Sequence, residues 1–520
     1  MLVNKYKAKI KTIDELLEII GVRPRQQKVI MCHGTFDVVH PGHIRHLMYA
    51  KEKAAILIAS LTTDAHIKKA NFRPFIPEDL RAVNLAALDM VDYVIIDHEK
   101  TPLHHLKKIQ PDFFAKGYEY VSEGMPKETQ DEKDALDGYG GEFIFTPGDV
   151  VFSSSKFIEM SPPQLGPEKL AALMEAEDLT FDDLRDAVRN CRNAKVHVVG
   201  DTIVDSYTHT SMIGGQTKTP TISVRYEGEN HYVGGAGVVA KHLSAAGASV
   251  IFSTVLGDDN WKDFVIADLK KANVLVNAII TESRPTTNKN AIVCDNYRLL
   301  KIDTLDNSSI SGSVSRQLQG KISSEDADAI VFSDFRHGIF NPSTIPDLIK
   351  SIPENMFKVA DSQVASRWGN ICDFQDFDLL TPNEREARFA LGDQDSVIRP
   401  LALKLYHSAN CKNLILKLGE RGLIAYRPIN DIDKNTRSFF IIDSFADHVV
   451  DAVGSGDALL AYSTLVHVTN GNSTIAAIIG SMAAACECEF DGNVPVSQEN
   501  ILNKINWVER KVNYVGEQEV

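Results

Sequence analysis

Apolar and polar residues alternate along the chain in short blocks that predict strands and helices in turn. Apolar runs at 28–32, 55–61, 93–96 and 112–115 predict strands, and segments with helical spacing at 42–53, 77–88 and 101–109 lie between them. One more strand is predicted at 142–146. Strands that alternate with helices of this length are typical of a parallel sheet with helices on both faces.

Three prolines within residues 161–167 interrupt this alternation and indicate a linker. Helices are predicted at 168–177 and 181–191, and a second alternating block begins with a strand at 196–199. We therefore expect two α/β domains, each a mainly parallel, Rossmann-like sheet flanked by helices. The expected boundaries are an N-terminal extension at 1–27, a first domain at 28–160, a linker with helices at 161–193, a second domain at 194–510 and a tail at 511–520.

The composition narrows the function classes. Of 520 residues 44% are hydrophobic and 24% charged, which is typical of a globular protein. Lysine and arginine number 55 against 70 acidic residues, a net charge of −15 without a basic run, so we expect no nucleic-acid partner. Seven cysteines without a C-x-x-C pair, no signal-peptide pattern and a longest apolar run too short for a bilayer predict a reduced, cytoplasmic protein without a membrane partner.

The strongest local signal in the first block is Gly-Thr-Phe-Asp-Val-Val-His-Pro-Gly-His at 34–43, between a predicted strand and a predicted helix. Ligands of parallel sheets bind at the carboxyl ends of strands, and helix N-termini favour phosphates. Imidazoles at His40 and His43 would stabilise charge as pyrophosphate leaves a nucleoside triphosphate. Two alternatives remain: histidines that only cap or pack, and a metal site with His46, although no nearby cysteine or acidic pair completes a tetrahedral set.

The string resembles the H-x-G-H motif of the cytidylyltransferase-like nucleotidyltransferases. Residues 73–81 are similar to that family's R-P-x-x-P-x-x-x-R stretch, residues 111–117 to its P-D-x-x-x-K-G segment, and the serines at 153–155 to its S-T-T. The resemblance implies nucleotidyl transfer with His40 and His43 as catalytic residues. It also implies nucleotide and phosphate contacts from Gly34, Thr35, Phe36, Asp37, Lys69, Arg73, Lys116, Ser153, Ser154 and Ser155.

The second block contains a glycine-rich turn, Asp-Ala-Val-Gly-Ser-Gly-Asp at 451–457, at the start of an apolar helix. Glycines let backbone N–H groups approach an anion closely, and Asp457 could accept the proton of an alcohol that attacks a γ-phosphate. Taken alone, the turn is also compatible with a plain helix cap. Further polar residues follow successive predicted strands, at 205, 334, 361 and 383–386, which is where this architecture places a ligand.

This assembly resembles the ribokinase/phosphofructokinase-B family of carbohydrate kinases, over about 195–510. The resemblance implies that Asp457 is the catalytic base and that Gly454, Ser455 and Gly456 form the anion hole. It implies sugar contacts from Asp205, Gly234, Gly235 and Lys289. On the nucleotide side it implies Asn383, Lys417, Gly419 and Gly422, with Glu386 linked indirectly to Mg²⁺.

Residues 284–289 and 300–303 are similar to the kinase half of the bifunctional heptose kinase/adenylyltransferases of ADP-heptose synthesis, with the order of the halves reversed. Two positions depart from that pattern: Val238 stands where the family has asparagine, and Ala291 where it has arginine. Both changes remove polar contacts to the substrate, so a different sugar, one without a distal phosphate, is expected.

The resulting hypothesis is a bifunctional enzyme of nucleotide-sugar synthesis. The C-terminal domain would phosphorylate a heptose-like sugar at its anomeric oxygen with ATP and Mg²⁺, and the N-terminal domain would transfer AMP to a sugar phosphate. CTP is the alternative nucleotide for the N-terminal domain, and a homodimer is the expected assembly. The alternative hypothesis is a cytidylyltransferase for a sugar or polyol phosphate joined to a non-catalytic, kinase-like sensor.

Overall fold

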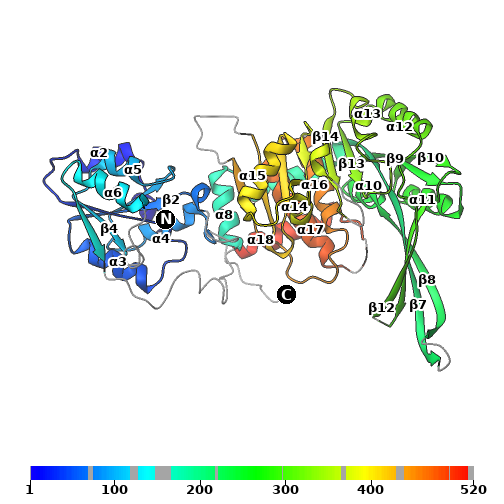
Figure 1. Cartoon of the computed structure of the whole chain (residues 1–520), viewed down its shortest axis with the longest axis horizontal. Helices are drawn as coiled ribbons and strands as arrows, with labels where there is room; N and C mark the ends of the chain where they lie inside the picture. Colours follow the sequence, from blue (N-terminus) through cyan, green and yellow to red (C-terminus); the bar gives the residue numbers. More distant parts are fainter. Residues whose placement is uncertain are drawn as a thin grey trace. The chain divides into compact units, whose positions relative to one another are not determined.

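A computed structural model describes residues 2–67, 74–117, 127–146, 166–216, 221–295, 297–364, 370–428, 438–490, 492 and 494–512. The chain forms two compact units, Met1–Ala172 and Leu173–Val520 (Figure 1). Each unit is built around its own parallel sheet, as the alternation of strands and helices predicts, so the expected α/β fold class is confirmed.

The first unit has a five-stranded parallel sheet with the order β3-β2-β1-β4-β5. Its strands are β1 (Val29–Gly34), β2 (Ile56–Thr62), β3 (Tyr93–Asp97), β4 (Phe113–Gly117) and β5 (Glu142–Thr146). The strand order reverses between β1 and β4. At such a reversal the connections diverge to opposite faces, which leaves a crevice outside the carboxyl ends of the strands.

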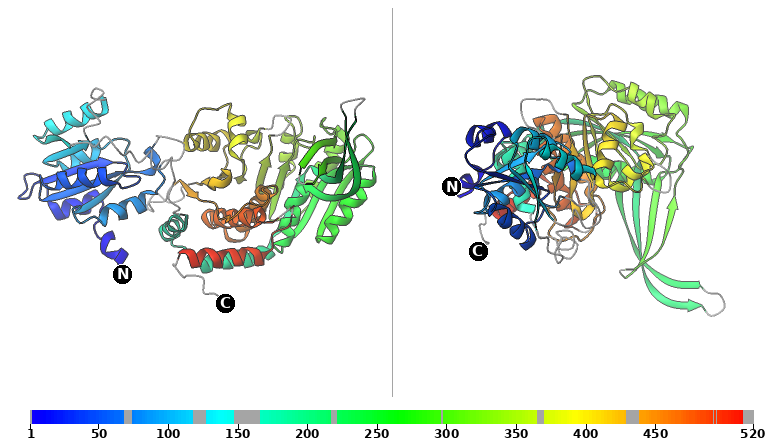
Figure 2. Two further views of the ribbon diagram at one scale, coloured as in Figure 1. Left: turned by 90° about the horizontal axis from the view of Figure 1, so that it is seen from below. Right: turned by 60° about the vertical axis from the view of Figure 1, so that its left-hand side comes forward.

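Helices cover both faces of this sheet (Figure 2). One apolar cluster joins the sheet to α3 (Pro41–Lys51) and α4 (Glu78–Ala86), and another joins it to α2 (Ile13–Ile20), α5 (Leu103–Ile109) and α6 (Lys127–Asp137). Two separate clusters explain why the strands contain continuous apolar runs, since residues that point to either face are buried. Further described helices are α1 (Leu2–Lys7), the short 3-10 helix at Asp64–His66, and α8 (Gly166–Ala176), which contains the boundary between the two units.

The second unit has a nine-stranded sheet with the order β10-β9-β6-β13-β14-β15-β16-β17-β18, parallel except at the β16–β17 and β17–β18 pairs. Its strands are β6 (Lys195–Gly200), β9 (Ser249–Gly257), β10 (Val274–Thr281), β13 (Ala329–Asp334), β14 (Phe357–Ser362), β15 (Leu379–Leu380), β16 (Asn413–Lys417), β17 (Leu423–Tyr426) and β18 (Phe439–Ile442).

The helices of this unit are α9 (Phe181–Asn190), α10 (Ala236–Ala245), α11 (Asn260–Lys271), α12 (Gly312–Ser324), α13 (Ile345–Lys350), α14 (Glu384–Leu391), α15 (Ile398–Ala409), α16 (Ser455–Asn470), α17 (Ser473–Cys488) and α18 (Gln498–Val512). Helices α16 and α17 are buried almost throughout, which accounts for the long apolar run near residue 480. Among the described residues, no helix has the length and apolar character needed to cross a membrane.

A second sheet of this unit is not predicted by the sequence analysis. We call it the lid sheet: β7 (Thr202–Gln216), β8 (Thr221–Gly235), β11 (Thr287–Cys294) and β12 (Tyr297–Thr304), in the order β12-β11-β7-β8. It projects from the rest of the unit as a long blade (Figure 1). Strand β7 begins, and strand β8 ends, beside the carboxyl end of β6. The base of the lid sheet therefore adjoins the edge of the sheet where a ligand is expected.

Candidate functional site

The H-x-G-H loop of the first unit brings two imidazoles together at a helix N-terminus. His40 caps α3: its Nδ1 accepts a hydrogen bond from the Gly42 N–H at 3.1 Å. The rings of His40 and His43 lie 4.0 Å apart between centroids, and both side chains are half-buried. A Cβ at Gly42 would lie 2.8 Å from the His40 ring, so only glycine allows this approach. The pair lies where a phosphate would meet free N–H groups.

The third imidazole, His46, does not join this pair. Its Nδ1 lies 2.7 Å from the Thr146 Oγ1 at the end of β5, and burial lowers the pKa of His46 to about 4. His46 is therefore a neutral, hydrogen-bonded ring that links α3 to β5.

Asp37 and Arg81 connect this loop to the segment that follows it. The buried Asp37 accepts a hydrogen bond from the Ile76 N–H at 2.9 Å through Oδ1. Arg81 is fully buried and donates to the carbonyls of Thr35, Thr62 (3.0 Å) and Ile76 (2.9 Å) and to the Asp64 carboxylate. Arg81 is not among the site residues expected from the sequence. A guanidinium with several backbone acceptors holds the loop in one position.

Lys116 is the penultimate residue of β4, the strand at which the strand order reverses. It is buried, forms an ion pair with Glu132 on α6, and lies 3.4 Å from the Thr129 Oγ1. Burial raises the pKa of Glu132 despite the lysine. The other expected phosphate-binding residues of this domain, Lys69, Arg73, Ser153, Ser154 and Ser155, lie outside the described residues.

A buried polar cluster that the sequence analysis missed lies at the carboxyl ends of β1, β2 and β3. The Ser60 Oγ lies 3.0 Å from Nδ1 of His33 and 3.3 Å from Nδ1 of His105, and Nε2 of His105 lies 3.6 Å from the Asp97 carboxylate. Burial raises the pKa of Asp97 to about 6. The only signal in the sequence is a histidine and a serine inside apolar runs.

In the second unit, the glycine-rich turn forms the start of α16. Gly454 caps the helix with a left-handed backbone (φ +92°), and Asp457 lies in the first helical turn, half-buried. Burial and the nearby carboxylates of Asp361 and Glu386 raise the pKa of Asp457 to about 7, against the opposing charge of Lys417. A carboxylate with this pKa at a helix N-terminus is suited to accept a proton near neutral pH.

Lys417, at the end of β16, is the cation of this site. Its Nζ lies 3.2 and 3.3 Å from the two Asp361 oxygens, and a Cβ at Gly456 would lie 3.1 Å from it. Burial alone would lower the pKa of Lys417, but the carboxylates of Asp361, Glu386 and Asp457 raise it. The ends of β14 and β16 and the start of α16 therefore meet at one point.

The N-x-x-E segment forms the start of α14. Asn383 accepts a hydrogen bond from the Glu386 N–H at 2.9 Å, and Glu386 accepts one from the Asn383 N–H at 2.7 Å, so the two residues form a capping box. Burial and Asp361 raise the pKa of Glu386 to about 7. Gly419 and Gly422, with φ of +63° and +83°, form the turn between β16 and β17. Each expected nucleotide-side residue thus lies on this edge of the sheet.

The expected sugar contacts lie at the base of the lid sheet. A Cβ at Gly234 would lie 2.1 Å from the Asp205 Oδ2 and would displace that carboxylate, and one at Gly235 (φ +61°) would lie 2.5 Å from the Asp201 carbonyl, which excludes any side chain there. Lys289 is paired with Asp205 across β11 and β7. The two departures from the resemblance, Val238 and Ala291, are both buried.

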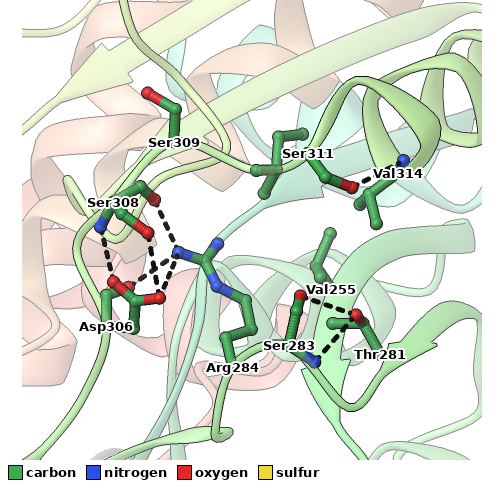
Figure 3. Close-up of a pocket in the computed structure, with 10 residues that line it drawn as sticks. Val255, Thr281, Ser283, Arg284, Asp306, Ser308, Ser309, Ser311 and Val314 are labelled. Atoms are coloured by element: carbon green, nitrogen blue, oxygen red, sulfur yellow. Dashed lines mark hydrogen bonds and ion pairs between the residues drawn. The ribbon is translucent and has the colours of Figure 1, made fainter.

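A hydroxyl-lined cavity of about 190 Å³ lies beyond the ends of β9 and β10 (Figure 3). Arg284 lines this cavity, and its guanidinium donates hydrogen bonds to the carbonyls of Asp306 (2.8 Å) and Ser308 (2.6 Å). A guanidinium held in this way fixes the loop that follows the lid sheet. Nearby, the buried Asp201 accepts backbone N–H groups from the loop after β13, so it positions that loop.

Each half of the chain matches a protein family. The pfkB family of carbohydrate kinases matches residues 193–495, and the cytidylyltransferase-like family matches residues 31–160. Similar proteins include the "Bifunctional protein HldE" of Geobacter metallireducens, which is 39% identical over 137 residues (26% of this chain, 27% of that protein). The protein of the same name from Campylobacter concisus is 40% identical over 117 residues (22% and 25%). The chain thus matches about a quarter of the length of these relatives.

Solved structures show the fold of the larger unit. Phosphofructokinase-2 from Escherichia coli in its tetrameric inhibited form superposes with a TM-score of 0.51 and 16% sequence identity, covering 61% of this chain and all of that one. The same enzyme in complex with substrates and products gives a TM-score of 0.51 at 17% identity over the same shares.

Proposed function

This chain belongs to the pfkB family of carbohydrate kinases, and from that premise we propose that its C-terminal unit transfers the γ-phosphate of ATP to a sugar hydroxyl. The observation that carries the proposal is the position of Asp457: a half-buried carboxylate with a pKa raised to about 7, in the first turn of α16 and near Lys417. The substrate class is a heptose-like sugar that reacts at its anomeric oxygen.

Different residues of the site have different roles in this transfer. Asp205 and the Gly234–Gly235 turn orient the sugar, and Asp457 accepts the hydroxyl proton as the sugar oxygen bonds to the γ-phosphorus and the bond to ADP breaks. N–H groups of the turn at Gly454–Gly456 face the phosphate oxygens, where charge develops. Lys417 adds positive charge beside the same turn.

Asp361 and Glu386 fit a Mg²⁺ ion that arrives with ATP. Both carboxylates are buried, and Asp361 raises the pKa of Glu386, so their repulsion would be relieved by a divalent cation. Mg²⁺ commonly takes one or two protein carboxylates together with substrate phosphates. When bound, the ion would neutralise charge on the phosphates.

For the N-terminal unit we propose nucleotidyl transfer to a sugar phosphate. A phosphate oxygen of the sugar attacks the α-phosphorus of the nucleotide, and the bond to pyrophosphate breaks. His40 and His43 would stabilise the charge on the phosphates, while Asp37 and Arg81 hold their loop in place. ATP is the preferred nucleotide and CTP the alternative.

The two activities together would make an activated sugar in the cytoplasm. Tethering successive catalysts raises their effective concentration, which gives a physical reason for the fusion.

We also propose a homodimer, because the outer part of the lid sheet exposes the large apolar side chains of Met212, Ile222 and Tyr226. Sedimentation equilibrium should then give twice the chain mass of 57.5 kDa, and Ile222→Lys with Tyr226→Lys should give the monomer.

The kinase is tested by incubating purified protein with Mg·ATP and a panel of sugars and sugar phosphates, with products identified by mass. Asp457→Asn should lower sugar phosphorylation by about 10²- to 10⁴-fold, since it removes the base but keeps the shape of the side chain. Asp447→Asn, a change of an exposed residue in the preceding loop, is the matched control. Tight ATP binding without turnover in the wild-type protein would instead support a non-catalytic sensor.

The nucleotidyltransferase is tested by pyrophosphate release with ATP or CTP and the same acceptors. His43→Ala should lower release by about 10²- to 10³-fold and leave sugar phosphorylation unchanged. The exposed His104→Ala is the control. Loss of both activities in His43→Ala would contradict the assignment of one activity to each unit.

A further inference from the structure

Five polar side chains of the first unit contact one another in sequence where β1, β2 and β3 end beneath α5. We call them the histidine relay; in order they are Thr62, His33, Ser60, His105 and Asp97. The Thr62 Oγ1 lies 3.2 Å from Nε2 of His33, and Nδ1 of His33 lies 3.0 Å from the Ser60 Oγ. The Ser60 Oγ lies 3.3 Å from Nδ1 of His105, whose Nε2 faces the Asp97 carboxylate at 3.6 Å.

The relay runs from the edge of the sheet into its interior. Its inner three members are buried, whereas His33 and Thr62 are half-buried. Thr62 is the last residue of β2, at the carboxyl edge where a ligand is expected. The guanidinium of Arg81 donates to the carbonyls of both Thr62 and Thr35, and Thr35 belongs to the H-x-G-H loop. The outer end of the relay therefore adjoins the site proposed for nucleotidyl transfer.

Both imidazoles of the relay are neutral near pH 7. Burial and the charge of Lys116 lower the pKa of His33 to about 3, and burial lowers the pKa of His105 to about 4. A neutral imidazole has one N–H donor and one acceptor nitrogen, and a hydroxyl has a single proton. A member that donates on one side must accept on the other, so all bonds of the relay run in the same direction.

Asp97 sets that direction. It is fully buried, and its Oδ2 has no hydrogen-bond partner within the described part of the chain. An ionised carboxylate favours an N–H on the ring nitrogens that face it, which are Nε2 of His105 at 3.6 Å and Nδ1 of His33 at 3.9 Å. His105 then accepts from Ser60, Ser60 accepts from His33, and the other nitrogen of His33 accepts from Thr62. The Thr62 oxygen is left with only lone pairs for a ligand.

Protonation of Asp97 reverses the relay. A carboxylic acid donates to the nitrogen that faces it, each bond turns round, and the hydroxyl of Thr62 can donate outward. Burial raises the pKa of Asp97 to about 6, so this change falls between about pH 5 and pH 7. Other ionisable groups act on Asp97 and the two rings from the neighbouring segments; they are His66, His98, Glu99, His104, Lys108 and Lys116.

We propose that Thr62 binds a hydroxyl group of the sugar phosphate in the N-terminal unit, and that ionised Asp97, acting through the relay, makes Thr62 the hydrogen-bond acceptor in that contact. This inference rests on the proposed nucleotidyl transfer. Hydrogen bonds that run in one direction polarise one another, so a negative charge at Asp97 makes the Thr62 oxygen a stronger acceptor. Asp97, His105, Ser60 and His33 are positioning residues in this proposal, because they act through Thr62.

The first test measures KM in pyrophosphate release. The KM of the sugar phosphate should fall as the pH increases from 5 to 7, because Asp97 ionises. The phosphate of the substrate ionises in the same range, so the comparison is with Ser60→Ala, which interrupts the relay only. The ratio of the KM at pH 5 to that at pH 7 should be at least threefold larger in the wild type. Ser253→Ala, which removes a buried serine 2.8 Å from His197 in the other unit, should give the wild-type ratio.

The contact with the substrate is tested at Thr62. Thr62→Val removes the hydroxyl and keeps the shape of the side chain, so it should raise the KM of the sugar phosphate about fivefold at pH 7. Thr62→Ser should retain the wild-type KM, and neither change should alter the KM of the nucleotide more than twofold.

Nitrogen NMR of the full-length protein with ¹⁵N-labelled histidine reads the relay without any activity. His33, identified by the signals lost in His33→Gln, should carry its proton on Nδ1 at pH 7 and on Nε2 at pH 5. In Ser60→Ala its tautomer should be the same at both pH values.

Three results would overturn the inference: one tautomer of His33 at both pH values in the wild type, an equal KM ratio in Ser60→Ala, or an unchanged KM in Thr62→Val. If no nucleotidyl transfer occurs, calorimetric titration with the sugar phosphate replaces KM. Weaker binding to Thr62→Val, with the tautomer change intact, would then support the inference and contradict the proposed transfer. Equal binding to Thr62→Val and the wild type would overturn the inference.

Discussion

Asp457 gives the kinase reaction a predicted pH dependence. Burial and the charges around it raise its pKa to about 7; the charged groups involved are Asp361, Lys417, Glu386 and Asp205. A base must be ionised to accept a proton, so kcat/KM should rise as the pH increases through about 7 and level off above it. The profile is measured from pH 5.5 to 8.5 at saturating Mg·ATP. A flat profile would show that Asp457 does not limit the reaction.

Glu487 on α17 predicts a stability effect. It is 1% exposed, and burial together with Asp457 and Asp451 raises its pKa to about 8. Because this pKa is above that of the unfolded chain, ionisation disfavours the folded state progressively from about pH 4.5 to about pH 8. Glu487→Gln should therefore raise Tm by about 2–6 °C at pH 8 and have little effect near pH 4.5. The exposed Glu499→Gln on α18 should change Tm at neither pH.

At the residue scale, the sequence predicted the site residues that belong to short local motifs. The His40–His43 pair and the turn before Asp457 lie within one short segment, so their approach follows from local geometry. The burial of Arg81 and the contact of Lys417 with Asp361 could not be predicted, because their partners lie up to 56 residues away in the chain. Those contacts arise only when strand order brings distant strand ends together.

At the scale of elements, the end of β8 predicts a substrate-affinity effect. A Cβ at Gly234 would lie 2.1 Å from the Asp205 Oδ2, so Gly234→Ala must displace that carboxylate. We expect the KM of the sugar to rise at least tenfold, with the KM of ATP changed less than threefold. Gly320→Ala on α12, where a Cβ meets open space, is the control. An equal rise in both KM values would indicate a general distortion instead.

The elements also show where sequence patterns were insufficient. Strands and helices of the two parallel sheets were predicted because burial on both faces makes their strands continuously apolar. The lid sheet was missed because β12 is exposed along nearly its whole length and mixes apolar with charged residues. Without a buried face, a strand shows no alternation that separates it from a loop.

At the scale of the whole molecule, two units with separate cores predict two unfolding transitions. Calorimetry should resolve them, and a nucleotide should stabilise only the unit that binds it. A ligand at about 100 times its Kd adds roughly 2.7 kcal/mol, enough to shift one transition visibly. Titration of the wild-type protein with ATP and, separately, with CTP then shows which nucleotide raises which transition. A single transition that both nucleotides shift equally would contradict independent units.

The carboxylates around Lys417 have a consequence for the form in which the nucleotide enters. Three acidic groups face one ammonium, an excess of two negative charges once all three are ionised above about pH 7, in a chain that is itself acidic. ATP without a bound metal ion is a polyanion, so it would be repelled at long range by the acidic chain and at short range by the carboxylates of the site. The substrate should therefore be the metal-complexed nucleotide, and an excess of chelator should abolish nucleotide binding as well as phosphate transfer.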